Sequence, residues 1–191
     1  MAGKQAKTLT ASQFSAALRR AGRGRHACRD RAMVLLSVKA GLRAGEIAKL
    51  TWPMVLGAGG EIADRIELHD CAAKKSSGRT IPLHPELRQA LLRLYRSSSP
   101  TGPVIRSERG GALLPSSVVN WFRELYRGLG LSGCSSHSGR RTFITQAARL
   151  VHKTGGSLRD VQQLAGHRSI EHTQGYIEGS ESAKRRLVAL L

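Results

Sequence analysis

The stretch from residue 135 to residue 176 constrains the fold of this chain more than any other. Apolar side chains recur in it at spacings of three and four, which predicts an amphipathic helix over residues 138–153. A glycine pair ends that helix, Ser157 can cap a second helix over residues 158–165, and Gly166 ends the second one. A short third helix follows, so the stretch is predicted to be a series of helices joined by tight turns.

Four polar side chains in this stretch have no role that the apolar pattern requires. His137 and Arg140 lie three positions apart at the start of the first helix, so they share one face near the positive end of its dipole. His167 falls in the turn after the second helix, and Tyr176 lies on the third. Two imidazoles, a guanidinium and a phenol at helix ends suit a phosphate-binding pocket with a tyrosine nucleophile.

The charge of the chain favours a polyanionic partner. The formal net charge is +18, from 31 Lys and Arg against 13 Asp and Glu among 191 residues. Nucleic acid is the leading candidate for such a partner. No run of 18 apolar residues is present, so we expect no membrane span, and the first residues do not form a signal peptide.

The cysteine and histidine content argues against a metal site. The three cysteines are widely spaced and form no C-x-x-C pair, which is typical of free thiols in a reducing cytosol. Of the seven histidines, His167 and His172 are five apart and would point to different faces of a helix. We therefore expect neither a metal nor another cofactor.

The rest of the chain predicts a mainly helical α+β fold. Residues 1–9 are expected to form a disordered basic tail, and residues 10–191 a single domain. Further helices are expected over residues 10–20, 26–40, 42–50, 85–97, 118–129 and 183–191. A small antiparallel three-stranded sheet is expected from strands over residues 54–56, 65–68 and 80–83.

Four motifs carry a resemblance to a known family. Residues 137–142 read H-x-x-R-R-T and resemble the H-x-x-R box of the tyrosine recombinases, or phage integrase family. Residues 164–167, L-A-G-H, followed by Tyr176, resemble its L-x-G-H and tyrosine boxes, and residues 41–50 resemble the box that supplies its first catalytic arginine. The resemblance covers about residues 42–177 and implies the catalytic-domain fold of that family.

The resemblance also implies a role for each site residue. The catalytic set would be Arg43, Lys74, His137, Arg140, His167 and Tyr176. The two arginines would hold the non-bridging oxygens of a DNA phosphodiester, and Tyr176 would attack it. His137 would accept the phenol proton, and His167 would donate a hydrogen bond to a phosphate oxygen.

Two further roles concern neighbours of these residues. Glu46 would orient Arg43 without acting on the substrate itself, although an ordinary ion pair at this spacing is the simpler explanation. A lysine in the hairpin would protonate the departing 5′ oxygen, and Lys74 fits that position better than its neighbour Lys75, which stays the alternative. Further contacts with DNA are expected from Arg23, Arg25, Lys75, Arg79, Arg141 and Arg168.

Taken together, the resemblance implies a site-specific recombinase or integrase. It would cleave and rejoin double-stranded DNA through a 3′-phosphotyrosyl intermediate, as a tetramer on DNA, in the cytoplasm of a bacterium or as a phage-derived protein. The apolar helix over residues 183–191 could be exchanged with a neighbouring subunit. Two alternatives stay open: a DNA-binding relic without activity, and a relaxing enzyme of the type IB topoisomerase kind.

Two departures from the family pattern bear on these expectations. Only about forty residues precede the box of Arg43, so no separate N-terminal domain that clamps DNA is expected. Within the H-x-x-R box, Ser138 and Gly139 replace an acidic and an apolar residue. Glycine lowers helix propensity, so Gly139 is expected to loosen the packing that aims Arg140.

Overall fold

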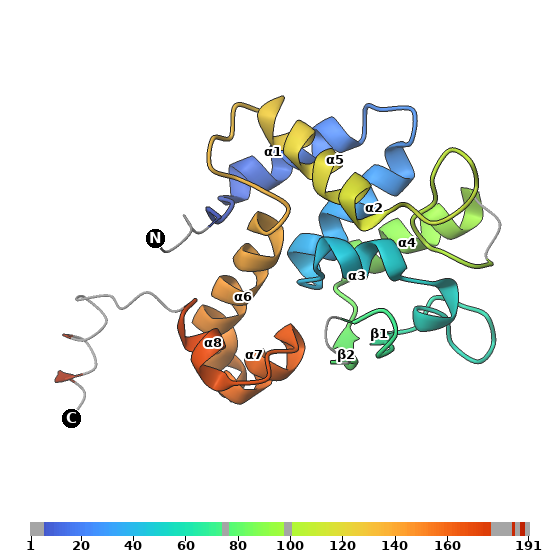
Figure 1. Ribbon diagram of the computed structural model, residues 1–191. Coiled ribbons are helices and arrows are strands. Elements are labelled where there is room, and N and C mark those ends of the chain that lie inside the picture. Colours follow the sequence, from blue (N-terminus) through green and yellow to red (C-terminus); the bar gives the residue numbers. More distant parts are fainter. Residues whose placement is uncertain (1–5, 74–76, 98–100, 177–184, 186–187, 190–191) are drawn as a thin grey trace.

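The computed structural model describes residues 6–73, 77–97, 101–176, 185 and 188–189, and it is mainly helical, as predicted (Figure 1). The helices are α1 (Ala11–Ala21), α2 (Ala27–Lys39), α3 (Ala44–Lys49), α4 (Pro85–Ser97), α5 (Pro115–Arg127), α6 (Ser138–Leu150), α7 (Leu158–Ala165) and α8 (Ile170–Gln174). The described residues also form two short 3₁₀ helices, η1 (Trp52–Met54) and η2 (Val151–Thr154), and two strands, β1 (Arg65–Leu68) and β2 (Arg79–Pro82).

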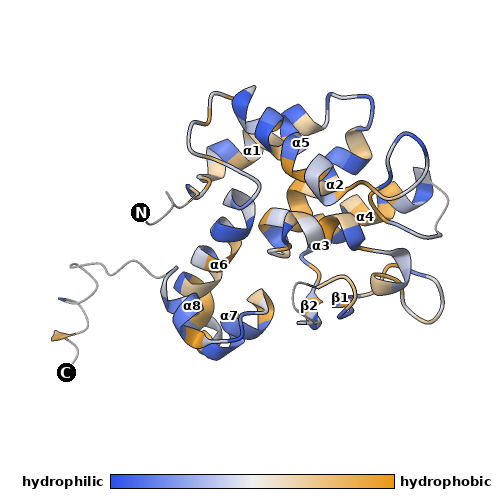
Figure 2. Ribbon diagram, in the orientation of Figure 1, coloured by the Kyte–Doolittle hydropathy of each residue, from blue (hydrophilic) through white to orange (hydrophobic). Residues whose placement is uncertain are grey.

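Helix α2 is the centre of what we call the main body, which comprises α1 to α5 and the sheet. Helices α1, α4 and α6 all pack against α2. Its residues Val34, Leu35 and Leu36 are fully buried. Figure 2 shows hydrophobic residues gathered where α2, α4 and α5 meet. The main body therefore has one continuous apolar core.

Helices α6, α7 and α8 with η2 form what we call the C-terminal lobe, which lies to one side of the main body (Figure 1). The lobe contacts the main body where α6 packs on α2 and where α7 packs on β2. Its own core is small and consists of Ile144, Ala148, Val151, Val161 and Ala165. The two cores are thus separate clusters of buried side chains.

Most of the predicted helix ends are confirmed. Thr10 forms a capping box with Gln13 at the start of α1, and Ser157 caps α7. Gly155 and Gly166 have φ of 72° and 62°, the left-handed conformation that ends a helix at little cost for glycine. The local sequence therefore sets the turns that carry the polar side chains.

The predicted three-stranded sheet is wrong in its first strand. Strands β1 and β2 pair antiparallel, with Ile66 opposite Ile81. Residues 54–56 form no strand: η1 ends at Met54, and Leu56 makes only an isolated bridge with Ile62. Proline has a fixed φ and no N–H, so Pro53 favours the turn over a ladder. The sheet within the described residues has two strands.

The described part of the predicted disordered tail over residues 1–9, residues 6–9, makes defined contacts with the rest of the chain. Leu9 is buried in the main core, and its N–H donates a hydrogen bond of 2.7 Å to Thr142 Oγ1 on α6. The Lys7 N–H donates to the carbonyl of Gly133. Residues 1–5 lie outside the described part of the chain. No helix of the described part is long and apolar enough to cross a bilayer.

Candidate active site

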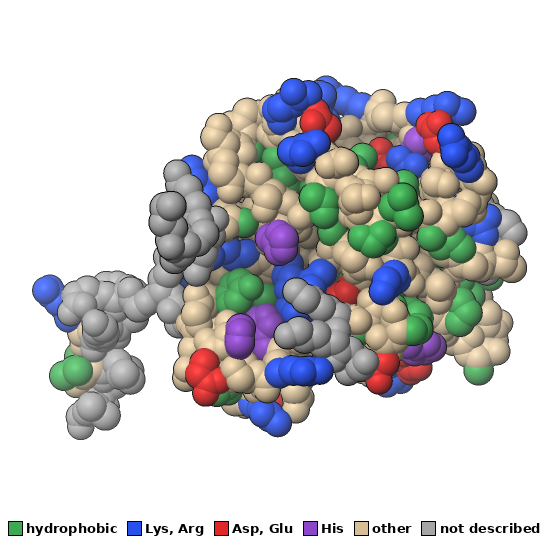
Figure 3. All heavy atoms as spheres, in the orientation of Figure 1, with side chains coloured by type: hydrophobic (Ala, Val, Ile, Leu, Met, Phe, Trp, Pro, Cys, Tyr) green, Lys and Arg blue, Asp and Glu red, His purple; other side chains and the backbone are tan. Residues whose placement is uncertain are grey.

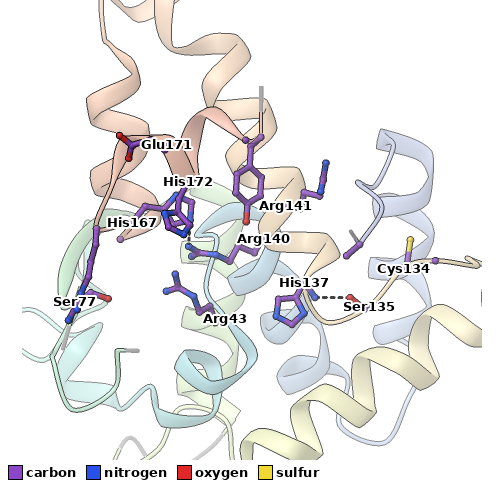
Figure 4. A pocket seen from close by; sticks show the side chains of 16 residues that line it. Arg43, Ser77, Cys134, Ser135, His137, Arg140, Arg141, His167, Glu171 and His172 are labelled. Carbon is purple, nitrogen blue, oxygen red and sulfur yellow. Dashed lines mark hydrogen bonds between the residues drawn. The ribbon is translucent and has the colours of Figure 1, made fainter. Parts of the chain in front are cut away.

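A cavity of about 980 Å³ opens between the main body and the C-terminal lobe. Five of the predicted catalytic residues line it: Arg43, His137, Arg140, His167 and Tyr176. Figure 3 shows histidine, lysine and arginine side chains gathered on this face, and Figure 4 shows the cavity from close by. The predicted Lys74 and Lys75 lie outside the described residues. The fold therefore brings together side chains that are far apart in the sequence.

Arg43 is fixed by Glu46 at the start of α3. The backbone N–H of Arg43 donates to Glu46 Oε2 at 2.9 Å, and its Nη1 donates to Glu46 Oε1 at 2.6 Å. The Arg43 side chain is 24% exposed and the Glu46 side chain 1%, so the guanidinium lies between a buried carboxylate and the cavity. These contacts fit the expected orienting role of Glu46.

Glu46 stays ionised although it is buried. Burial by itself raises the pKa of this carboxyl, but the hydrogen bonds and charges of Arg79 and Arg43 outweigh it and lower the pKa to about 2. One carboxylate is therefore shared by two guanidiniums, and the group of three carries a net charge of about +1 at the cavity wall.

Arg140 joins the two parts of the molecule. Its Nη1 donates to the carbonyl of Gly41 at 2.6 Å, and its Nη2 donates to the carbonyl of Ala165 at 2.6 Å and to His167 Nε2 at 3.0 Å. The residue is only 4% exposed. Burial and the nearby positive charge of Arg43 lower the pKa of Arg140 to about 9, so it remains charged at neutral pH.

Two glycines allow this placement of Arg140. Gly41 has φ of 63°, and a Cβ there would overlap the ring of Phe143. A Cβ on Gly139 would overlap Ser37 Oγ and come within 2.9 Å of Ser37 Cβ on α2. The expectation that Gly139 loosens the packing is therefore wrong, since its missing side chain lets α6 approach α2 closely.

His167 is held between Arg140 and Thr173. A guanidinium can only donate, so His167 Nε2 accepts from Arg140, and the proton is on Nδ1, which lies 3.0 Å from Thr173 Oγ1. Burial, then the charges of Arg140 and Arg43, lower the pKa of His167 to about 4. A neutral ring with Nε2 as acceptor differs from the predicted donor to a phosphate oxygen, because Arg140 already occupies that nitrogen.

Tyr176 lies against the same group. Its ring stacks on the His167 ring with centroids 5.6 Å apart and planes at 26°, and Arg141 Cζ lies 5.7 Å from the Tyr176 ring centroid. The Tyr176 backbone N–H donates to the carbonyl of Thr173 at 3.0 Å. Thr173, which is fully buried, therefore contacts both His167 and Tyr176. Thr173 was not among the residues predicted from the sequence; its one signal there is its position on a short helix, three residues before the tyrosine.

His137 lies at the opposite side of the cavity from His167 (Figure 4). It is the N-cap residue of α6, its side chain is exposed, and its backbone N–H donates to Ser135 Oγ at 3.3 Å. An exposed imidazole at the rim of the cavity can exchange protons with solvent. Within the described residues, no group of three or more His, Cys, Asp or Glu side chains is placed to hold a metal ion.

The predicted DNA contacts fall into different environments. Arg141 and Arg168 line the cavity, and Arg23 and Arg25 are exposed near the α1–α2 turn. Arg79 is different, because its side chain is 6% exposed and is paired with Glu46. A buried, ion-paired guanidinium is poorly placed to contact DNA, so this environment argues against the predicted DNA contact of Arg79.

Comparison with known proteins identifies the family. The profile of the phage integrase family matches residues 7–182. The tyrosine recombinase XerC of Brucella suis biovar 1 is 30% identical over 158 residues, which cover 78% of this chain and 46% of that protein. XerC of Rhizobium meliloti is 28% identical over 164 residues, 83% of this chain and 48% of that protein. The chain spans about half the length of the curated relatives it matches.

Solved structures share the fold. The XerA recombinase superposes with a TM-score of 0.73 at 22% identity, over 100% of this chain and 65% of that one. The XerH site-specific recombinase bound to its difH substrate superposes with a TM-score of 0.71 at 18% identity, over 99% of this chain and 55% of that one. With the family profile matched over nearly its whole length, the chain belongs to the phage integrase family.

Proposed function

We propose that this protein cleaves and rejoins DNA at specific sites through a 3′-phosphotyrosyl intermediate. The observation that carries the proposal is the position of Tyr176, which shares one cavity with Arg43 and Arg140. A phenol that shares a cavity with two guanidiniums suits an attack on a phosphodiester. The family to which the chain belongs, and its XerC relatives, support the same reading.

The two arginines would bind the scissile phosphate. Arg43 is partly exposed at the cavity wall, so it can meet a non-bridging oxygen from the solvent side. Arg140 is buried deeper, beside His167, and would meet the second oxygen. Positive charges fixed in advance around the phosphate stabilise the pentacoordinate transition state, which carries extra negative charge.

Proton transfer would involve groups at the rim. The Tyr176 phenol must lose its proton as it attacks, because the phosphotyrosyl product carries no hydroxyl hydrogen. His137 is the exposed base at the cavity and would accept that proton. Lys74, or Lys75 as the alternative, would protonate the departing 5′ oxygen. Because the phosphotyrosyl bond conserves the energy of the phosphodiester, a 5′ hydroxyl could reverse the step without ATP.

His167 would change its role when a phosphate binds. In the structure it is a neutral acceptor for Arg140. A phosphate anion would compete for Arg140 and would raise the pKa of the imidazole, since an opposite charge favours the protonated form. The imidazolium could then donate from Nε2 to a phosphate oxygen.

The proposed partner is double-stranded DNA. The Tn1549 transposon integrase, which shares the fold, is solved with a circular intermediate DNA, and a lambda integrase dimer with a COC′ core site. The net charge of +18 supports a DNA partner here too. Assembly as a tetramer on DNA and location in the bacterial cytoplasm belong to the same proposal. Residues 183–191, expected to contact a neighbouring subunit, lie mostly outside the described residues.

A nicked suicide substrate tests the function. When the nick releases a short fragment after cleavage, the protein stays trapped on the DNA as a covalent adduct. Wild-type protein should form this adduct, and Tyr176→Phe should bind the DNA without forming it. Phenylalanine keeps the ring that stacks on His167, so loss of the adduct reports the hydroxyl alone.

Three other outcomes would contradict parts of the proposal. Wild-type protein that shifts DNA in a gel but forms no adduct would be a binding protein only. An adduct that persists in Tyr176→Phe would exclude Tyr176 as the nucleophile. Relaxation of supercoils without any recombinant product would identify a topoisomerase-like enzyme.

A further inference from the structure

We infer that Arg79 is a positioning residue of the proposed strand-transfer site: it holds Glu46, and through it Arg43, in register with the turn that carries His167. This inference rests on the proposed function. It replaces the expectation that Arg79 contacts DNA. Arg79, on β2, would instead help to align Arg43 and His167.

Arg79 uses its whole guanidinium inside the protein. Its Nη1 and Nη2 donate to the two oxygens of Glu46 at 3.2 and 3.0 Å, and its Nε donates to the carbonyl of Leu164 at 2.9 Å. A planar fork that binds both carboxylate oxygens fixes direction as well as distance. Arg79 thus links three elements, β2, α3 and α7, at one buried point.

On the α3 side, Arg79 determines how strongly the guanidinium of Arg43 is held by Glu46. Glu46 is shared between the two arginines, so Arg79 can balance the buried carboxylate while Arg43 keeps its positive charge for the cavity. Without Arg79, Arg43 would be the remaining partner of a buried anion. It would be drawn to Glu46 and would bind a transition-state oxygen less well.

On the α7 side, Arg79 fixes the end of the helix that precedes His167. The last two carbonyls of α7 are held by two buried arginines, Leu164 by Arg79 and Ala165 by Arg140. Cations at a helix C-terminus are also favoured by its dipole. A Cβ on Gly166 would lie 2.9 Å from Arg79 Nη1, so the turn and the guanidinium fit each other closely.

The test separates the rate of cleavage from the affinity for DNA. Arg79→Gln is compared with Arg65→Gln, which also removes one positive charge from the sheet. Arg65 lies on β1, is 53% exposed and pairs with Asp64 away from the cavity. Adduct formation on the nicked substrate is measured in single turnover at saturating DNA, and the dissociation constant is measured at several salt concentrations.

We expect Arg79→Gln to slow adduct formation about 10- to 100-fold at saturating DNA, as loss of alignment at two residues of a site does. Its DNA affinity and the slope of affinity against salt should change no more than in Arg65→Gln. If instead affinity and salt slope fall while the saturated rate stays at the wild-type value, Arg79 is a DNA contact and the inference is overturned.

A second variant distinguishes positioning from a general role in folding. Glu46→Gln/Arg79→Gln removes the buried carboxylate together with its partner, so Arg43 is no longer drawn away. This double variant should recover part of the rate that Arg79→Gln loses. Glu46→Gln alone is measured as well. A double variant whose fold loss in rate equals the product of the two single fold losses would overturn the inference, because the residues would then act independently.

Failure of a variant to fold, or of the wild-type protein to react, would also be informative. If Arg79→Gln does not fold, Arg79→Lys is used; lysine keeps the charge but cannot reach both Glu46 oxygens and Leu164 at once, so a smaller loss of rate with unchanged affinity is expected. If wild-type protein forms no adduct, the proposed function fails and this inference with it. If wild-type protein forms the adduct and both Arg79 variants match its rate, only the positioning role fails.

Discussion

The main body and the C-terminal lobe are held together in different ways. The main body buries a continuous core that runs from Leu9 to Tyr126, whereas the lobe has five buried hydrophobic residues of its own. At the boundary, buried arginines bind backbone carbonyls: Arg140 joins Gly41 to Ala165, and Arg79 holds Leu164. Apolar burial therefore stabilises the main body, and hydrogen bonds from buried arginines position the C-terminal lobe against it.

This difference matters because the lobe carries His167 and Tyr176, while Arg43 belongs to the main body. Hydrophobic packing is not directional, so it tolerates small displacements. A hydrogen bond to a charged group contributes about 1.5–3 kcal/mol, and its direction is fixed. The relative position of the two parts is therefore fixed more precisely than apolar packing alone would fix it.

The largest expected effect compares the same truncation in both parts. Leu36→Ala in α2, where the side chain is fully buried, should lower the free energy of unfolding by about 2–5 kcal/mol. Leu158→Ala in α7 should cost about 1 kcal/mol, because that side chain is only partly buried. Denaturant unfolding measures both. Equal losses would mean that the lobe has a core as substantial as that of the main body.

The contact between α6 and α2 should be the next most sensitive. Gly139→Ala places a methyl group where Ser37 already lies, so it should destabilise the protein by about 1–3 kcal/mol through overpacking. Ser37→Gly removes both overlapping atoms, and the double variant should regain part of the loss. Ser37→Gly that fails to restore any stability would locate the strain elsewhere in α6.

The elements of the lobe could be predicted from the sequence because their signals are local. Ser157 and Gly166 set the ends of α7, and the spacing of apolar residues set α6. The candidate catalytic residues were predicted from their motifs by resemblance, and the fold brings Arg43, Arg140 and Tyr176 to one cavity.

The contacts across the boundary could not be predicted, because they join residues far apart in the chain. No local sequence signal distinguishes the buried Arg79 from an exposed arginine, because its partners are 33 and 85 positions away in the chain. Gly139 has the same difficulty: its low helix propensity is visible in the sequence, but the serine that it accommodates on α2 is not. The tautomer of His167 likewise depends on Arg140 and Thr173 together.

A smaller effect should appear in the dependence of stability on pH without DNA. The folded-state pKa of His167, about 4, lies below its ordinary 6.5, so the native state binds fewer protons and stability should fall as pH drops from about 6.5 to about 4. Solvent at the half-buried ring limits the loss to the order of 1 kcal/mol. Thermal unfolding across this range measures the loss.

Two variants test whether His167 causes this dependence of stability on pH. His167→Gln should flatten it, while His84→Gln should change it less, since the pKa of His84 is also lowered but the residue is exposed to solvent. Glu46 contributes only below its ordinary pKa of 4.5, because its carboxyl has a pKa of about 2 in the fold. An unchanged slope in His167→Gln would mean that the boundary does not hold the imidazole neutral.

The smallest effect concerns a single hydroxyl. Thr173→Val keeps the size of a fully buried side chain but removes the acceptor for His167 Nδ1–H, which should cost about 0.5–1 kcal/mol and slow adduct formation several-fold. Thr173→Ser keeps the hydroxyl and should retain most of the rate, as single-turnover kinetics would show. If serine is as slow as valine, packing by the methyl group and not the hydrogen bond places His167, and the lobe would depend on apolar contact as the main body does.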